Sequence, residues 1–207
     1  MALRHVVFWD VDTQVDFMLP HGKLYVPGAE RIIPNLKRLV DVAREGRVLL
    51  VADVDAHVPD EEEFKDFPPH CVQGTPGQKK IPETLMPNPL IIPNAWHVRL
   101  PDQFAAGQQV IIEKRTLDVF TNPSTEAVLD RVVRSTAPEK PEFIVFGVAT
   151  EYCVLCVVSG LLDRGHSVSI VTDAIEALNA TAGQQTLGQL RSRGARLITA
   201  EQALALV

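Results

Sequence analysis

Two cysteines follow an apolar run in the segment Gly147-Val-Ala-Thr-Glu-Tyr-Cys153-Val-Leu-Cys156. The pattern predicts a buried strand, a tight turn and then a helix that begins near Cys153. Free backbone N–H groups in the first turn of a helix favour a thiolate over a thiol. They can also stabilise an oxyanion that forms at an attacked carbonyl carbon. Cys153 is therefore a candidate nucleophile, with simple packing on an apolar helix as an alternative of about equal weight.

The two cysteines also form a C-x-x-C pair, which occurs in thioredoxin-like redox sites and in halves of zinc sites. A structural zinc would need a second ligand pair, which Cys71 alone cannot supply. The apolar residues around Cys156 favour a buried helix over an exposed redox turn. We therefore expect Cys156 to be a core residue, and a non-catalytic binding or redox protein remains the alternative from a different class.

Three charged residues near other predicted strand ends could assist a nucleophile. Asp12 closely follows the first predicted strand, and its partial burial would raise its pKa toward that of a general base. Asp16 fits better as a turn or helix-capping residue. Lys114 ends an apolar strand, where a cation can stabilise a thiolate and hold a carboxylate, although a single lysine is more often a surface residue.

A possible metal site follows the second predicted strand. In an extended Asp55-x-His57 segment, both side chains point to the same side, as two ligands of one ion require. The acidic run 61–63 and His70 come shortly afterwards. Oxygen and imidazole donors suit zinc, iron or manganese. Taken singly, the acidic run would more often be a solvated face and either histidine a structural residue.

The elements that must position these residues alternate between apolar strands and helices. Continuous apolar runs predict strands that are buried on both faces of a parallel sheet: His5–Asp10, Val48–Asp53, Val110–Glu113, Phe143–Ala149, Ser167–Thr172 and Ala195–Thr199. Helical periodicity and glycine stops predict helices over Ala29–Glu45, Ser124–Ser135, Tyr152–Arg164 and Asn179–Arg193. Pro34 fits the first of these helices only in its first turn.

This alternation predicts a three-layer α/β/α fold with a central, mostly parallel sheet of about six strands. We expect one domain over residues 1–207, with a proline-rich excursion at about 55–96. So long a segment without periodicity is uncommon in a compact domain unless it is functional. It follows the carboxyl edge of a predicted strand, where open α/β sheets bind their ligands.

The composition excludes several classes of protein. The 207 residues are 46% hydrophobic and 22% charged, which is typical of a globular chain. The net charge of −6 disfavours a nucleic-acid partner. No apolar run approaches the roughly 18 residues of a membrane span, and the N-terminus has no signal-peptide pattern, so we expect a cytoplasmic protein without a membrane partner. Nucleotide-phosphate loops and the motifs of zincins and common serine hydrolases are also absent from the sequence.

Together, the candidate segments resemble the nicotinamidase branch of the isochorismatase-like cysteine hydrolases. The resemblance covers most of the chain in the expected order. Its motifs are Asp12-x-Gln-x-Asp16-Phe17, Leu24-x-Val26-Pro-Gly-Ala29, Asp55-x-His57, His70-Cys-Val-x-Gly74-Thr-x-Gly77, Lys114 and Gly147-Val-Ala-Thr-x-x-Cys153-Val.

The resemblance implies an isochorismatase-like hydrolase fold and a role for each matching residue. It implies that Cys153 is the nucleophile, Asp12 the general base and acid, and Lys114 their electrostatic support. It further implies a cis peptide at Val148–Ala149, and an oxyanion hole formed by the N–H groups of Ala149 and Cys153. One divalent ion is expected on Asp55, His57 and His70, with Glu63 where some relatives have a further histidine. The expected substrate contacts are Phe17, Phe67, Val148 and Tyr152.

The expected reaction is deamidation of nicotinamide to nicotinate and ammonia through a cysteine thioester, with the metal ion orienting the pyridine ring. The alternative within this family is hydrolysis of another small amide, ureido or carbamoyl compound. Isochorismate hydrolysis is disfavoured, because relatives with that activity lack the nucleophilic thiol. The expected partners are a small-molecule amide and further copies of the chain, in a dimer or tetramer.

Overall fold

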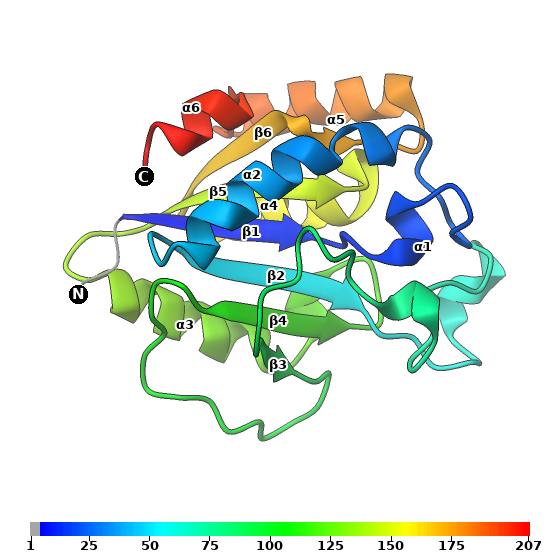
Figure 1. The fold of residues 1–207 in the computed structure, drawn as a ribbon, viewed down its shortest axis with the longest axis horizontal. Helices are drawn as coiled ribbons and strands as arrows, with labels where there is room; N and C mark the ends of the chain where they lie inside the picture. Colours follow the sequence, from blue (N-terminus) through cyan, green and yellow to red (C-terminus); the bar gives the residue numbers. More distant parts are fainter. Residues whose placement is uncertain (1–4) are drawn as a thin grey trace.

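A computed structural model describes residues 5–207 as a single twisted sheet between two layers of helices (Figure 1). Its seven strands pair in the order β3-β4-β2-β1-β5-β6-β7, and every neighbouring pair is parallel. The strands are β1 (Val6–Val11), β2 (Leu49–Asp55), β3 (Leu90–Ile92), β4 (Gln109–Lys114), β5 (Glu142–Val148), β6 (Ser167–Glu176) and β7 (Arg196–Ile198). The predicted three-layer fold is confirmed, but the sheet has seven strands and not about six.

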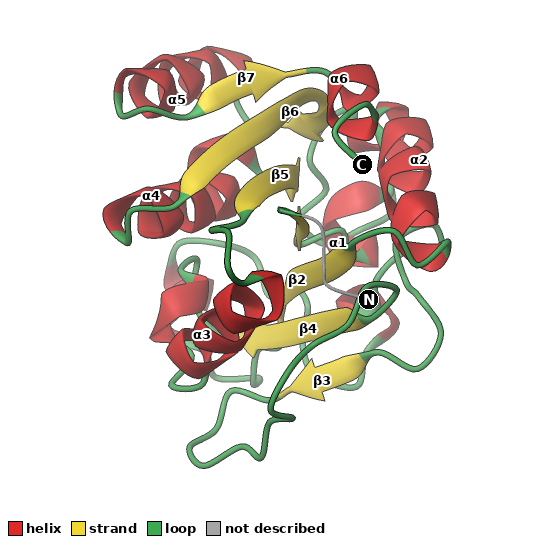
Figure 2. Ribbon diagram, turned by 90° about the vertical axis from the view of Figure 1, so that its left-hand side faces the viewer, coloured by secondary structure: helices red, strands yellow, loops and turns green. Residues whose placement is uncertain are grey.

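Helices cover both faces of the sheet (Figure 2). They are α1 (Val15–Met18), α2 (Ile33–Arg44), α3 (Thr125–Thr136), α4 (Leu155–Asp163), α5 (Ala180–Ser192) and α6 (Ala200–Leu204). Side chains alternate along β1, so that Val7 and Trp9 join the apolar cluster under α3, α4 and α5, whereas Val6 and Phe8 join the cluster under α2 and α6. Each central strand is therefore buried on both faces, which explains its continuous apolar sequence.

Three elements were missing from the predicted set: β3, α6 and the four-residue helix α1, which is too short to show helical periodicity. The edge strand β3 has only three residues and lies inside the proline-rich segment, so neither length nor periodicity marks it. Helix α6 has five residues and follows β7 directly. In addition, the helix that was predicted over Ala29–Glu45 is divided: a 3₁₀ turn covers Ala29–Arg31, and α2 begins at Ile33 with Pro34 in its first turn.

The segment that carries Cys153 begins with an unusual turn. Residues Thr150–Val154 form a π-helical turn, and regular α-helix begins only at Leu155. The expected cis peptide lies immediately before this turn, between Val148 and Ala149. Cys153 thus lies ahead of α4, in a kind of turn that is often found at functional sites.

The parallel register gathers the carboxyl ends of four strands at one edge of the sheet. Val11 of β1 is level with Asp53 of β2 and Gly147 of β5, and Asp55 of β2 is level with Lys114 of β4. This is the edge where such sheets bind ligands. None of the helices between residues 5 and 207 has both the length and the apolar character of a bilayer-spanning segment.

Candidate active site

Lys114 lies at the centre of a buried charged group at this edge. Its Nζ is 2.8 Å from Asp12 Oδ2, forms an ion pair with Asp55 and is 3.6 Å from Cys153 Sγ. Burial opposes the charge on Lys114, but the carboxylates of Asp12 and Asp55 outweigh it and hold the lysine pKa well above its usual value. One permanently charged ammonium therefore contacts two carboxylates and a thiol that three different strands bring to the edge.

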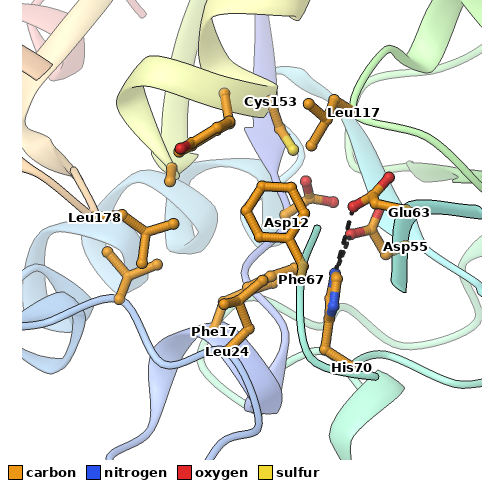
Figure 3. A pocket seen from close by; sticks show the side chains of 13 residues that line it. Asp12, Phe17, Leu24, Asp55, Glu63, Phe67, His70, Leu117, Cys153 and Leu178 are labelled. Carbon is orange, nitrogen blue, oxygen red and sulfur yellow. Dashed lines mark ion pairs between the residues drawn. The ribbon is translucent and has the colours of Figure 1, made fainter. Parts of the chain in front are cut away.

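Cys153 is 5% exposed, and its sulfur faces this group (Figure 3). Burial raises the pKa of the Cys153 thiol well above its ordinary value, and the ammonium of Lys114 lowers it only partly. The resting group is therefore a thiol, in contrast to the thiolate that its position near a helix start predicts. A nucleophilic role consequently requires a base that accepts the thiol proton.

Asp12 is placed to be that base. It has a φ of 47°, in the left-handed region that the short polar side chain of aspartate tolerates. Burial raises the pKa of Asp12 to about 6; the Lys114 charge opposes this rise and the Asp55 charge adds to it. A carboxylate with this proton affinity is still ionised at neutral pH and accepts a proton more readily than an exposed aspartate.

Gln14 fixes the main chain of Asp55. Its Nε2 donates to the Asp55 carbonyl at 2.8 Å, and its Oε1 accepts from the Asp55 N–H at 2.8 Å. Burial favours the neutral form of Asp55, but Lys114 and the imidazoles of His57 and His70 hold its pKa below the usual value. Gln14 had no predicted role, although it lies in the Asp12-x-Gln motif and both its amide nitrogen and its amide oxygen form hydrogen bonds.

Four side chains form a group that fits a metal ion. Asp55 Oδ2 lies 3.5 Å from His57 Nε2 and 3.4 Å from His70 Nε2. Glu63 Oε1 lies 3.9 Å from the same atom of His57 and 3.7 Å from that of His70. Donors that lie about 2.0–2.2 Å from a tetrahedral zinc are roughly 3.3–3.6 Å apart. A small contraction would therefore place all four donors around one ion.

The surroundings of the two histidines support this fit. His70 Nδ1 lies 2.8 Å from the Pro68 carbonyl, and donation to that oxygen leaves Nε2 free to bind a metal. His57 Nε2 and Asp55 Oδ2 are buried, and neither has a hydrogen-bond partner among residues 5–207. Buried polar atoms normally have partners, and a divalent cation would satisfy both atoms.

A pocket connects the charged group with the candidate metal site (Figure 3). Apolar side chains form most of its wall. The lining residues are Asp12, Phe17, Leu24, Val26, Asp55, Glu63, Phe67, His70, Leu117, Ala149, Tyr152, Cys153 and Leu178. The wall combines a flat apolar surface with a few polar groups at one end, as is typical of small-ligand pockets.

Most of the expected substrate contacts line this pocket, but not all of them. Phe17, Phe67 and Tyr152 do so, and the rings of Phe67 and Tyr152 meet edge to face with centroids 5.6 Å apart. Val148 is fully buried in the apolar cluster under α2 and does not line the pocket. Its expected contact with the substrate therefore stays a prediction that the pocket lining does not support.

The other predicted residues have clear positions. Asp16 accepts hydrogen bonds from the backbone N–H groups of Lys23 and Cys71, at 3.0 and 2.8 Å. It therefore anchors two loops, in agreement with the prediction of a turn residue. Cys156 is only partly buried, so its placement in the core was wrong. Both Cys156 and Cys153 are free thiols. The pocket residues Leu24 and Val26 belong to a motif that the sequence analysis used only for the resemblance.

The sequence pattern of the isochorismatase domain family matches residues 6–202. The chain belongs to this family. It is 27% identical to the nicotinamidase of Escherichia coli over 179 residues, which are 82% of each chain. A crystal structure of Pyrococcus horikoshii pyrazinamidase in complex with zinc is 27% identical, with a TM-score of 0.73 over 94% of this chain and 99% of that one. N-carbamoylsarcosine amidase of Thermoplasma acidophilum shares the fold, with 20% identity and a TM-score of 0.69 over 94% and 95% of the two chains.

Proposed function

We propose that this isochorismatase-family protein is an amide hydrolase that converts nicotinamide to nicotinate and ammonia through a thioester on Cys153. One observation carries the proposal. Lys114 joins Asp12, the Cys153 thiol and Asp55 in a single buried group, and Asp55 also belongs to a four-donor site of which three members line the same pocket. The relation to a nicotinamidase and to a zinc-bound pyrazinamidase supports both the reaction and the metal.

In the first half of the reaction, the sulfur of Cys153 attacks the carboxamide carbon while Asp12 accepts the thiol proton. Concerted transfer suits a thiol whose pKa is raised beside a carboxylate whose pKa is about 6. The backbone N–H groups of Ala149 and Cys153, two residues of the pocket wall, stabilise the oxyanion. Asp12 then protonates the leaving nitrogen, ammonia departs and a thioester remains.

In the second half, Asp12 accepts a proton from a water molecule that attacks the thioester carbon. The carbon–sulfur bond breaks, the carboxylic acid is released and Asp12 returns a proton to the sulfur of Cys153. The net change is consumption of one amide and one water, and formation of one acid and one ammonia. Lys114 keeps its proton throughout, since two carboxylates hold its pKa far above neutrality.

Asp55, His57, Glu63 and His70 would hold a divalent ion, zinc, iron or manganese, at one end of the pocket. When bound, the ion would act as a Lewis acid toward a pyridine nitrogen and so help to orient the ring. The apolar wall contributes the rest of the orientation, because Phe17, Phe67 and Tyr152 offer flat surfaces to an aromatic ring. A linear ureido or carbamoyl substrate lacks both the ring and the ring nitrogen, so it uses this pocket less fully.

Ammonia release from a panel of amides tests the proposal. We expect turnover of nicotinamide that exceeds turnover of benzamide, which lacks the ring nitrogen, and of linear ureido compounds. Chelation should remove the activity, and added zinc, iron or manganese should restore it. Full activity in the metal-free protein, or a preference for a ureido substrate, would contradict the proposal.

The thioester is tested with two cysteine variants. Cys153→Ala should abolish turnover with little change in stability, and rapid acid quenching of the wild type should trap a nicotinoyl group on Cys153. Cys156→Ala is the matched control: it should keep its activity and lose stability on the order of 1 kcal/mol, because it removes a partly buried side chain. Equal loss of activity in both folded variants would favour redox chemistry at the C-x-x-C pair.

A further inference from the structure

A second carboxylate lies behind the candidate metal site. Glu61 accepts two hydrogen bonds from Arg115, from Nε to Oε2 at 2.8 Å and from Nη2 to Oε1 at 3.0 Å. Its Oε2 also accepts the N–H of Val58 at 3.2 Å. The Glu61 side chain is only 11% exposed, so three donors hold it in one orientation. Of the acidic run 61–63, only Glu63 was expected to have a role, and Glu61 differs from its neighbours in its surroundings.

The ring of His57 faces this carboxylate on one side and the metal donors on the other. Nε2 points to Asp55 and Glu63, whereas Nδ1 lies 3.7 Å from Glu61 Oε2. The side chain is completely buried, and neither ring nitrogen has a hydrogen-bond partner in the part of the chain that the structure describes. A metal ion on Nε2 requires the ring proton to be on Nδ1, where Glu61 is the nearest carboxylate.

From this geometry we infer that Glu61, held by Arg115, is a positioning residue for the metal ligand His57. When a metal ion occupies Nε2, the carboxylate would accept a hydrogen bond from Nδ1–H as the 3.7 Å separation shortens, which fixes the tautomer and the ring orientation and makes Nε2 a stronger donor. The inference rests on the metal site of the proposed function. Glu61 is not itself a ligand in this arrangement, because it lies on the opposite side of the ring from the four donor atoms.

Arg115 connects the positioning group to the catalytic strand. It directly follows Lys114, the last residue of β4. Lys114 contacts the base Asp12, and Arg115 contacts Glu61, which lies beside the metal ligand His57. The fork of the guanidinium fixes both carboxylate oxygens, which a lysine would not do. The pair is therefore more than a loop anchor, and a variant of either residue should change metal binding.

Metal affinity, measured without substrate, tests this inference. The metal-free protein is titrated with Zn²⁺ in competition with a chromophoric chelator. Glu61→Ala should weaken binding roughly 10- to 100-fold, and Glu61→Gln should weaken it less, because it keeps a neutral acceptor oxygen. Glu62→Gln is the matched control, since Glu62 is the adjacent residue, is 83% exposed and, within residues 5–207, pairs only with Lys65; it should bind like the wild type.

Two further measurements separate positioning from other roles. The visible spectrum of the Co²⁺-loaded protein reports the ligand set, and it should be the same in Glu61→Gln and wild type. Arg115→Met alone should weaken Zn²⁺ binding. Combined with Glu61→Ala, it should weaken binding little further, because the arginine acts through the glutamate. Thermal unfolding of the metal-free variants shows whether a loss of affinity reflects a loss of folding.

Specific results would overturn the inference. Wild-type affinity in Glu61→Ala would remove any role for Glu61 at the metal. A Co²⁺ spectrum that changes with Glu61→Gln would make Glu61 a ligand, and additive losses would make Arg115 act independently of it. If the wild type itself binds no Zn²⁺, the metal site of the proposed function fails as well. If the wild type binds Zn²⁺ normally and Glu61→Ala binds it equally well, only the role of Glu61 fails.

Discussion

Two buried aspartate–lysine pairs begin on the same strand end, two residues apart. Asp12 pairs with Lys114 at 2.8 Å, and Asp10 pairs with Lys80 at 2.9 Å. Burial raises the pKa of both carboxyl groups, and all four side chains are almost inaccessible. Judged by charge and burial alone, the two pairs are the same kind of feature.

Their remaining neighbours distinguish them. Lys114 also contacts Asp55 and the Cys153 thiol, and Asp12 lines the pocket. Lys80 instead donates to the hydroxyl of Thr13 at 2.7 Å, which in turn bonds to Thr84, and it does not line the pocket. The Lys80 pair ties the proline-rich segment to the end of β1. A perturbed carboxyl group therefore indicates chemistry only where a nucleophile and an open pocket accompany it.

Replacing Lys114 should have the largest effect on the protein. Lys114→Met leaves Asp12 and Asp55 buried without their shared cation, so the free energy of unfolding should fall by about 3–5 kcal/mol. Turnover per folded molecule should fall roughly 10²- to 10⁴-fold. Denaturant unfolding and steady-state kinetics measure the two effects. Near-normal turnover in folded Lys114→Met would remove the distinction between the pairs.

Lys80→Met should lower the stability as much as Lys114→Met does, but without the loss of turnover. It leaves Asp10 buried and unpaired, so unfolding should again become easier by about 3–5 kcal/mol. Turnover per folded molecule should stay within roughly tenfold, a barrier change below about 1.4 kcal/mol. The double variant Asp10→Asn with Lys80→Met should recover part of the stability. A catalytic loss as large as that of Lys114→Met would show that both pairs serve the reaction.

The smallest expected effect is on the pH dependence. Asp12 must be ionised to accept the thiol proton, and its raised pKa of about 6 means that it becomes protonated as the pH falls through 6. The specificity constant kcat/KM should then fall about tenfold per pH unit below that value and level off above it. Lys80→Met should leave the inflection in place. An inflection near the ordinary aspartate pKa of about 4 would contradict the burial of the base.

The central fold was predictable because burial on both faces makes the strands of a parallel sheet continuously apolar. Leu90–Ile92 was missed because three residues between prolines carry no such signal. Helix α6 did leave a signal, since Thr199 and Gln202 form a capping box with the expected spacing. The π-helical turn at Thr150–Val154 has no sequence pattern that separates it from the start of an α-helix.

At the site, residue types and strand ends made Asp12, Lys114, Cys153 and the acid–histidine group candidates, and the family resemblance supplied their expected roles; the structure brings these residues together. Sequence alone does not give the depth of burial or the orientation of an individual side chain at the site. The raised pKa of the Cys153 thiol, the buried position of Val148 and the orientation of Glu61 toward His57 all depend on packing between distant segments. Gln14 was overlooked because its role lies in main-chain hydrogen bonds that only the assembled fold creates.

The shared ammonium of Lys114 has a consequence for engineering. Asp55 is both a candidate metal donor and a partner of Lys114, which also holds Asp12. Exchanging Asp55 to suit a different ion would therefore alter the proton affinity of Asp12 in the same step. Choice of ion and strength of the base are not independent design variables in this scaffold, and a redesign has to optimise them together.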